Sequence, residues 1–361
     1  MPISRTSPNA SSIIFLLLFL QIKNQLAYEK TKIYWNSPSA TCTRHNETGI
    51  NLEKFHIISN VGQKFSGNEI VLFYEKDIGL YPAIRKYANG SHVWEHNGIP
   101  QNVNMTEHLA KVKKDVGKLI PSHSFRGLAI LDFEEWRPFY DQNWSSKRIY
   151  REASIDKVMK KHPKIKRVDA IKIAKDEFDR ASLDFLVKTL KECQLMRPNA
   201  KWGFYGFPIC DENGATRNNT FCYPEHDNRL VEFLKYADAL YPSAYLYPGR
   251  TYHDKHLFVE DVLKETARMN AMIVNEGFQA KHVFVFHKFE LDPYVDNPND
   301  ILFYDKYHLC ITMKQTFDYG VDGILLWSTS KNMAKRCKHI SNYIEYHLGP
   351  YLHELQTFHD E

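Results

Sequence analysis

Seven short apolar segments alternate with longer helical patterns, and this alternation restricts the fold of the chain more than any other feature. Strands that are connected through helices run parallel, and a parallel sheet closes into a barrel when helices cover its outside. We therefore predict an α/β barrel with seven strands, one fewer than usual. The expected strands are Lys32–Asn36, Glu69–Tyr74, Gly127–Trp136, Lys201–Phe207, Ala237–Tyr245, His282–Phe289 and Gly323–Ser328. The expected helices are Lys166–Glu192, Asn228–Tyr236, Leu257–Asn275 and Asn299–Tyr319.

Two acidic residues, Asp132 and Glu134, stand at the end of the third apolar segment. Side chains alternate between the two faces of a strand, so both acids share one face with Leu128 and Ile130 and should point into the barrel mouth. The carboxyl ends of barrel strands carry the chemistry in enzymes of this architecture, and paired acids are typical of glycoside hydrolysis. Glu135 has the opposite parity, so we expect it to be an outward, solvated charge.

The two acids reach a sugar ring from the same side because they extend from one strand, whereas a carboxylate nucleophile must attack opposite the leaving group. Asp132 is therefore a poor nucleophile. The pattern favours an acid, a supporting carboxylate and a nucleophile supplied by the 2-acetamido group of an N-acetylated hexosamine. A purely structural pair, bonded to backbone or to arginine, is the alternative.

The 361 residues are 43% hydrophobic and 14% aromatic, enough to bury one large core, and we expect a single catalytic barrel domain over residues 28–361. Residues 1–27 resemble a signal peptide, with Arg5 before the apolar run Ile13–Leu20 and cleavage near Ala27. No other apolar run reaches membrane length. Five sequons, which fit an extracellular protein, begin at Asn46, Asn89, Asn104, Asn143 and Asn218. We therefore expect a secreted, soluble glycoprotein.

Four motifs, in order, are similar to those of the hyaluronidase family of insect venoms and mammals. They are Leu131–Pro138, Lys201–Cys210, Leu240–Leu246 and Gly323–Ser328. The resemblance implies a distorted TIM-like barrel with seven strands and an endo-β-N-acetylhexosaminidase that cleaves hyaluronan, and more slowly chondroitin, with retention of configuration. It also implies a monomer that binds glycosaminoglycans, with no cofactor, no metal, no nucleic acid and no membrane partner. The compact layout is similar to that of venom and salivary members.

The same resemblance implies roles for individual residues. Glu134 would be the general acid and base, and Asp132 would hold and polarise the acetamido group. Tyr205 and Tyr245 would orient that group, and Trp327 would line the pocket. The substrate contacts would be Arg137 and Ser328. Without the motifs, packing would be the simpler explanation for the aromatic residues, and Arg137 could instead neutralise Glu134 or Glu135.

Six cysteines in a secreted chain suggest disulfides, whose pairing the sequence alone does not fix. The resemblance implies the pairs Cys42–Cys337 and Cys210–Cys222. Cys193 and Cys310 fall on nearly opposite outer sides of a seven-strand barrel, so we expect both to be unpaired and buried. No cysteine or histidine spacing is typical of a metal site.

Two other functions fit parts of the pattern. One is a catalytically weak homologue that binds glycosaminoglycan, since a fold does not guarantee activity. The other is a chitinase-like barrel, which also ends a strand in Asp-x-Glu. Gly127 and Ile130 stand where the longer acidic repeat of that motif would place further aspartates. A digest of hyaluronan, chondroitin and chitin would distinguish these functions.

Overall fold

A computed structural model describes residues 31–44, 49–87, 90–211 and 220–358. The predicted signal peptide and the sequons at Asn46, Asn89 and Asn218 lie outside these ranges. The strands are β1 Lys32–Asn36, β2 Ile58–Ser59, β3 Ile70–Tyr74, β4 Ala83–Lys86, β5 His92–Glu95, β6 Leu128–Asp132, β7 Lys201–Phe204, β8 Ala239–Leu240, β9 His282–His287 and β10 Gly323–Trp327.

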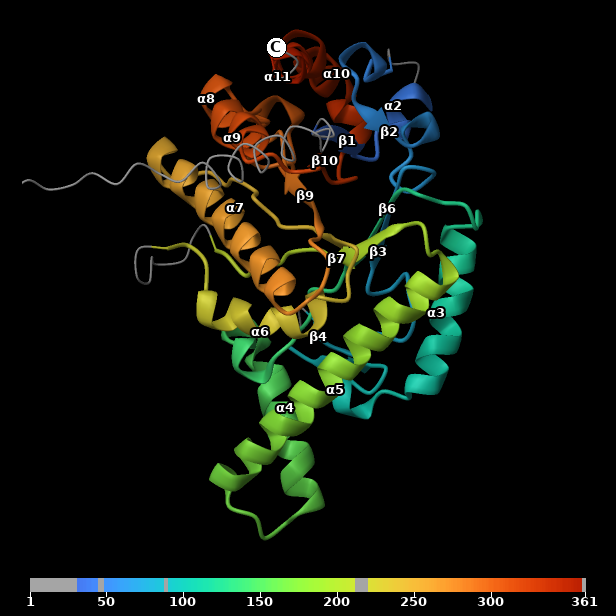
Figure 1. Cartoon of the computed structure of the whole chain (residues 1–361), viewed down its shortest axis with the longest axis vertical. Helices are drawn as coiled ribbons and strands as arrows, with labels where there is room; N and C mark the ends of the chain where they lie inside the picture. The colour runs from blue at the N-terminus through green and yellow to red at the C-terminus, as the bar shows by residue number, and fades with distance from the viewer. Residues whose placement is uncertain (1–30, 45–48, 88–89, 212–219, 359–361) are drawn as a thin grey trace, which may run out of the picture.

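The α-helices lie mainly outside the strands (Figure 1). They are α2 Ala40–Arg44, α3 Met105–Leu119, α4 Arg148–Lys161, α5 Arg167–Met196, α6 Pro224–Leu234, α7 Tyr252–Asn275, α8 Lys306–Leu309, α9 Gln315–Asp318, α10 Met333–Tyr343 and α11 Gly349–Phe358. π-Helical turns join α8 to α9 and α10 to α11, at Cys310–Lys314 and Ile344–Leu348. Single 3-10 turns occur at Glu53–Phe55, Val61–Gln63, Pro100–Asn102, Tyr140–Gln142, Ser145–Lys147 and Pro298–Asp300.

Two parallel sheets form the wall of a distorted barrel. One has the order β2-β1-β10-β9-β8, and the other has the order β3-β6-β7. A parallel bridge between Tyr205 and Tyr241 connects β7 to β8. On the opposite side no ladder joins β2 to β3 in the described ranges, but the Asn60 side chain bonds to the backbone of Glu69 and Ile70. All seven predicted strands are therefore present, with β2 in addition.

Side chains that alternate along each strand point in turn to the barrel interior and to the surrounding helical layer. In β6, Leu128 and Ile130 belong to the inner cluster, whereas Ala129 and Leu131 pack in the outer cluster with the helices. The inner cluster is completed by residues of five other strands, among them Leu72, Phe286 and Leu325. The predicted inward direction of Leu128 and Ile130 is confirmed, and residues at the strand ends face the mouth of the barrel.

Several predicted elements have different bounds in the structure. The segment Asn299–Tyr319 is not one helix, because Asp305 caps a new start by accepting bonds from the amides of Tyr307 and His308. Strand β8 covers only two residues, and beyond it Pro242 has no amide hydrogen to donate to a ladder. The antiparallel β4–β5 hairpin and helices α3, α4, α10 and α11 were not predicted.

Both predicted disulfides are present. Cys42–Cys337 links α2 to α10, which lie side by side in Figure 1, and Cys210–Cys222 closes the loop after β7. Cys193 is free and buried, as expected. Cys310 is free but exposed, so the prediction of burial was wrong there. Its π-helical turn buries the three residues that follow it and turns Cys310 to solvent.

The asparagines of the two described sequons differ in their exposure to solvent. Asn104 is exposed and caps α3, where its side chain accepts a bond from the Glu107 amide. Asn143 is fully buried, and its amide group bonds to the backbone of Arg137 and Phe139. A glycan on Asn143 would have to replace these bonds, so the structure argues against glycosylation at Asn143.

Candidate active site

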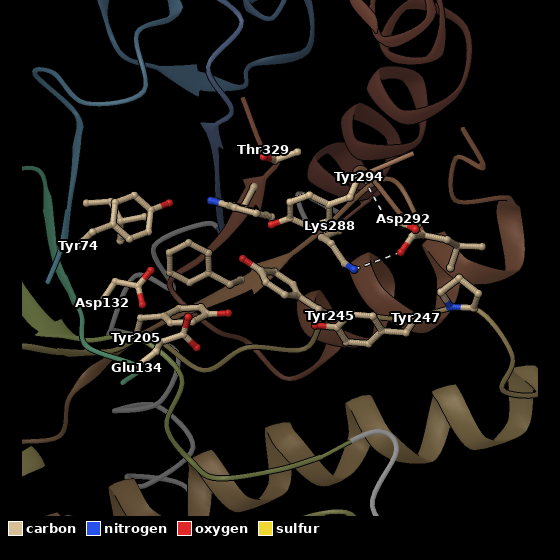
Figure 2. Close-up of a pocket in the computed structure, with 15 residues that line it drawn as sticks. Tyr74, Asp132, Glu134, Tyr205, Tyr245, Tyr247, Lys288, Asp292, Tyr294 and Thr329 are labelled. Atoms are coloured by element: carbon tan, nitrogen blue, oxygen red, sulfur yellow. Dashed lines mark hydrogen bonds between the residues drawn. The ribbon is translucent and has the colours of Figure 1, made fainter. Parts of the chain in front are cut away.

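The mouth of the barrel contains a cavity of about 480 Å³ lined by side chains from the ends of several strands (Figure 2). Tyr74 ends β3, Asp132 ends β6, Lys288 follows β9 and Trp327 ends β10. Each continues the inward-facing side of its strand, because side chains alternate. All five residues predicted to be catalytic line this cavity, namely Asp132, Glu134, Tyr205, Tyr245 and Trp327.

Asp132 lines the cavity and is only 6% exposed. Its buried Oδ1 has no hydrogen-bond partner among the described residues. Burial raises the pKa of this carboxyl well above its usual range, and the nearby carboxylates of Glu134 and Glu75 raise it further. A buried polar atom without a partner is costly, so this oxygen is suited to accept a hydrogen bond from a ligand.

Glu134 lies just beyond the end of β6 and is exposed at the cavity mouth, but the surrounding protein partly removes its carboxyl group from solvent. Its backbone amide donates to Glu75 Oε1 at 2.8 Å. Burial of the carboxyl raises the pKa of Glu134, and Glu75 adds to this effect, while the positive charges of Lys147 and Arg137 oppose it. Raised pKa values at two adjacent carboxyls favour a state in which the pair retains a proton.

Aromatic side chains line the same cavity as the acids. The Tyr205 hydroxyl donates to Ser243 Oγ at 3.0 Å, and the rings of Tyr205 and Tyr245 lie 6.2 Å apart. The Tyr245 ring stacks on Trp327 at 5.7 Å. Burial raises the pKa of both tyrosines well above the usual value, so both keep their hydroxyl protons as hydrogen-bond donors.

A second cavity of about 270 Å³ continues on the other side of Glu134. It shares Glu134 and three tyrosines (Tyr205, Tyr245 and Tyr247) with the first cavity and adds Arg137 and Lys147, whereas Asp132 lines only the first. Two adjoining cavities on either side of one acid resemble a cleft that could hold a polymer with the scissile bond next to that acid.

Arg137 does not neutralise Glu134 or Glu135 directly, since neither carboxylate forms an ion pair with it in the described part of the chain. Its guanidinium lies over the Trp144 ring at 4.2 Å and donates to the Gln142 carbonyl at 3.0 Å. Glu135 points outward, as its parity predicted, but it pairs with Arg85 and is half-buried, which corrects the expectation of a solvated charge.

Ser328 does not line either cavity. It is 1% exposed, and its hydroxyl donates to Glu290 Oε2 at 2.6 Å. Arg336 of α10 contacts both residues, and Arg336 and Glu290 are fully buried. Ser328 therefore lies behind the cavity wall, next to Trp327, and its hydroxyl is not available to a substrate.

Several residues at the cavities were not predicted from the sequence. Tyr74 ends an apolar strand on its inward-facing side, so the rule that singled out Asp132 could have found it. Glu75 alternates to the other face, so the same rule would have missed it. Lys288 stands two residues after the inward-facing Phe286 and could have been found in the same way. Lys147 comes from a loop, and no local pattern marks it.

Groups of three or more potential metal ligands are absent from the described residues, and no described helix could cross a membrane.

Comparisons with known proteins agree over most of the chain. A family model described as hyaluronidase, glycoside hydrolase family 56, matches residues 22–359. A chondroitin hydrolase of Caenorhabditis elegans is 30% identical over 354 residues, covering 94% of this chain and 75% of that protein. Hyaluronidase-2 of Bitis arietans is 30% identical over 339 residues, covering 90% and 72%. The crystal structure of bee venom hyaluronidase in complex with a hyaluronic acid tetramer has a TM-score of 0.82 at 29% identity, covering 90% of this chain and 99% of that one.

Proposed function

Since the chain belongs to the hyaluronidase family of glycoside hydrolases, we propose that it is an endo-β-N-acetylhexosaminidase that hydrolyses hyaluronan and, more slowly, chondroitin. The observation that carries this proposal is the pair Asp132 and Glu134 at the barrel mouth. Both carboxyls have raised pKa values, and aromatic side chains line the sugar-sized cavity together with them. An acid that remains protonated beside a polar, ring-lined pocket is suited to glycoside chemistry.

The proposed reaction is substrate-assisted and retains the configuration at the anomeric carbon. Glu134 donates its proton to the glycosidic oxygen as the bond from that oxygen to the anomeric carbon breaks. The acetamido oxygen of the same sugar forms a bond to the anomeric carbon from the opposite face. Glu134, now a carboxylate, takes a proton from water, and that water attacks the anomeric carbon and releases the acetamido oxygen.

Asp132 would accept a hydrogen bond from the acetamido N–H through its otherwise unpartnered Oδ1 and would stabilise the positive charge that develops on that group. Tyr205 and Tyr245 would orient the acetamido group, and Trp327 would pack against the sugar ring. Arg137, in the second cavity, would bind an anionic part of the polymer.

Replacement of Glu134 by glutamine tests the proposal, with Glu135→Gln as the matched control because Glu135 pairs with Arg85 outside the cavities. The purified proteins are incubated with hyaluronan, chondroitin and chitin, and new reducing ends are measured. We expect Glu134→Gln to lose roughly 10²- to 10⁴-fold in rate while it still binds hyaluronan, and the control to stay near wild type.

Early-time NMR of the wild-type digest should show the β anomer first, because two inversions give retention. Initial appearance of the α anomer would exclude the substrate-assisted route. A wild-type protein that binds hyaluronan but cleaves none of the three polymers would instead be the catalytically weak, glycosaminoglycan-binding homologue.

Secretion and a monomeric state complete the proposal. Two disulfides fit an oxidising, extracellular compartment. Size-exclusion chromatography with light scattering on protein recovered from the medium of expressing cells tests both points. Retention inside the cell, or the mass of a dimer, would contradict them.

A further inference from the structure

Two cations, Arg137 and Lys147, line the second cavity, and the carboxylate of Glu134 attracts both of them without forming an ion pair. Neither forms an ion pair within 4.0 Å with any residue in the described part of the chain. Both are half-buried. Burial and the charge of Arg137 lower the pKa of Lys147, and the carboxylates of Glu134, Glu135 and Glu75 offset this only in part. Two like charges in a partly desolvated cavity repel each other, so a further anion placed between them would be stabilised.

The loop that carries these cations holds both of them in place. Asn143 bonds to the backbone amide and carbonyl of Arg137, and Trp144 lies under its guanidinium. Lys147 ends the 3-10 turn Ser145–Lys147, and its ammonium group donates to the carbonyls of Glu134 and Glu135. A site whose charges are already fixed loses little conformational entropy when it binds a ligand.

The position of the two cations relative to Asp132 indicates which sugar they would meet. Asp132 lines only the first cavity, so the hexosamine that it assists would lie there. Glu134 lines both cavities and protonates the oxygen of the leaving group, so the leaving sugar would enter the second cavity. In a polymer that alternates hexosamine with uronate, this next sugar is a uronate.

We propose that Arg137 and Lys147 form a carboxylate-binding subsite for the uronate on the leaving-group side, and that this subsite favours uronate-containing polymers over neutral ones. The inference rests on the function proposed above and assigns Lys147 a role in substrate selection. The guanidinium and the ammonium offer charge-assisted hydrogen bonds to a carboxylate. Asp211 is the other acidic residue besides Glu134 that lines this cavity among the described residues, and it is exposed at the rim.

The test compares two substrates across four proteins. The substrates are a hyaluronan oligosaccharide and the same oligosaccharide with its carboxyl groups reduced to alcohols. The proteins are wild type, Lys147→Met, Lys147→Arg and the control Lys157→Met. Lys157 is also partly buried and donates to a backbone carbonyl, that of Gln101, but it lines neither cavity.

We expect wild type to have a kcat/KM roughly tenfold to a hundredfold higher on the native oligosaccharide, as is typical for hydrogen bonds to charged groups. Lys147→Met should reduce this preference to about threefold or less, mainly through KM. Lys147→Arg and Lys157→Met should keep it. Equal loss on both substrates in Lys147→Met would show that Lys147 only supports the backbone of the loop, and a wild type without preference would rule out the subsite.

Binding measurements separate this inference from the proposed function. The dissociation constants of both oligosaccharides are measured for Glu134→Gln with and without Lys147→Met. Glu134→Gln should bind the native oligosaccharide more tightly than the carboxyl-reduced one, and adding Lys147→Met should reduce this preference. Preferential binding by Glu134→Gln together with a wild type that cleaves neither substrate would refute the hydrolase function and leave the subsite standing. Cleavage without preferential binding would refute the subsite alone.

Discussion

The buried ion pair behind the cavity offers a sharp test of how the active-site wall is supported. Arg336 of α10 donates to both carboxylate oxygens of Glu290, at 2.8 and 2.9 Å, and both side chains are fully buried. Arg336 also donates to Ser328 Oγ at 3.1 Å and to the backbone carbonyls of Thr329 and Lys331. These residues directly follow Trp327, so the pair stabilises the segment after the catalytic wall.

Replacing Arg336 with methionine removes the cation and leaves the Glu290 carboxylate buried without a counter-charge. Breaking a buried pair in this way costs about 3–5 kcal/mol in the free energy of unfolding. The double variant Glu290→Leu/Arg336→Met removes the charge penalty, but the carbonyls of Thr329 and Lys331 still lose a donor, at about 1–3 kcal/mol for a buried group. We therefore expect the double variant to be more stable than Arg336→Met and less stable than wild type.

Urea unfolding followed by tryptophan fluorescence measures the free energy of unfolding of each variant, provided that unfolding is reversible and the slope of free energy with denaturant is unchanged. The double-mutant cycle then gives the coupling between the two residues. A loss below about 1 kcal/mol in Arg336→Met would refute the reasoning. Losses that simply add in the double variant would show that the pair is not coupled.

Three further predictions use separate features of the structure. Glu75→Gln should lower the pKa of Glu134, because the Glu75 carboxylate raises that pKa. The alkaline limb of the pH profile of kcat/KM should therefore move to lower pH, and an unchanged limb would contradict this prediction. Iodoacetamide should label Cys310 in the native protein and Cys193 only after unfolding, as peptide mass mapping can check. Of the two described sequons, Asn104 should carry a glycan in secreted protein and Asn143 should not, and a glycopeptide containing Asn143 would overturn its assignment as a buried loop support.

Features that depend on local periodicity could be predicted from the sequence. The seven strands and the helices α5, α6 and α7 follow from apolar patterns, because burial on one side of a strand or helix repeats with the period of that element. The inward direction of Asp132 and Glu134 follows in the same way, from their parity with Leu128 and Ile130. The roles proposed for the aromatic residues depended instead on the resemblance of whole motifs.

The tertiary structure decided which polar groups meet. Nothing in the sequence around Ser328 indicates that its hydroxyl is directed to Glu290, and nothing around Asn143 distinguishes a buried loop support from a glycan acceptor. Lys147 reaches the cavity only because its loop folds back onto the carbonyl of Glu134. Such contacts join groups from different elements, and a single polar residue in a loop has no period that reports which way it faces. The sequence by itself therefore determined the barrel and its acidic pair, while packing between distant segments determined the charges around that pair and the residues that hold them.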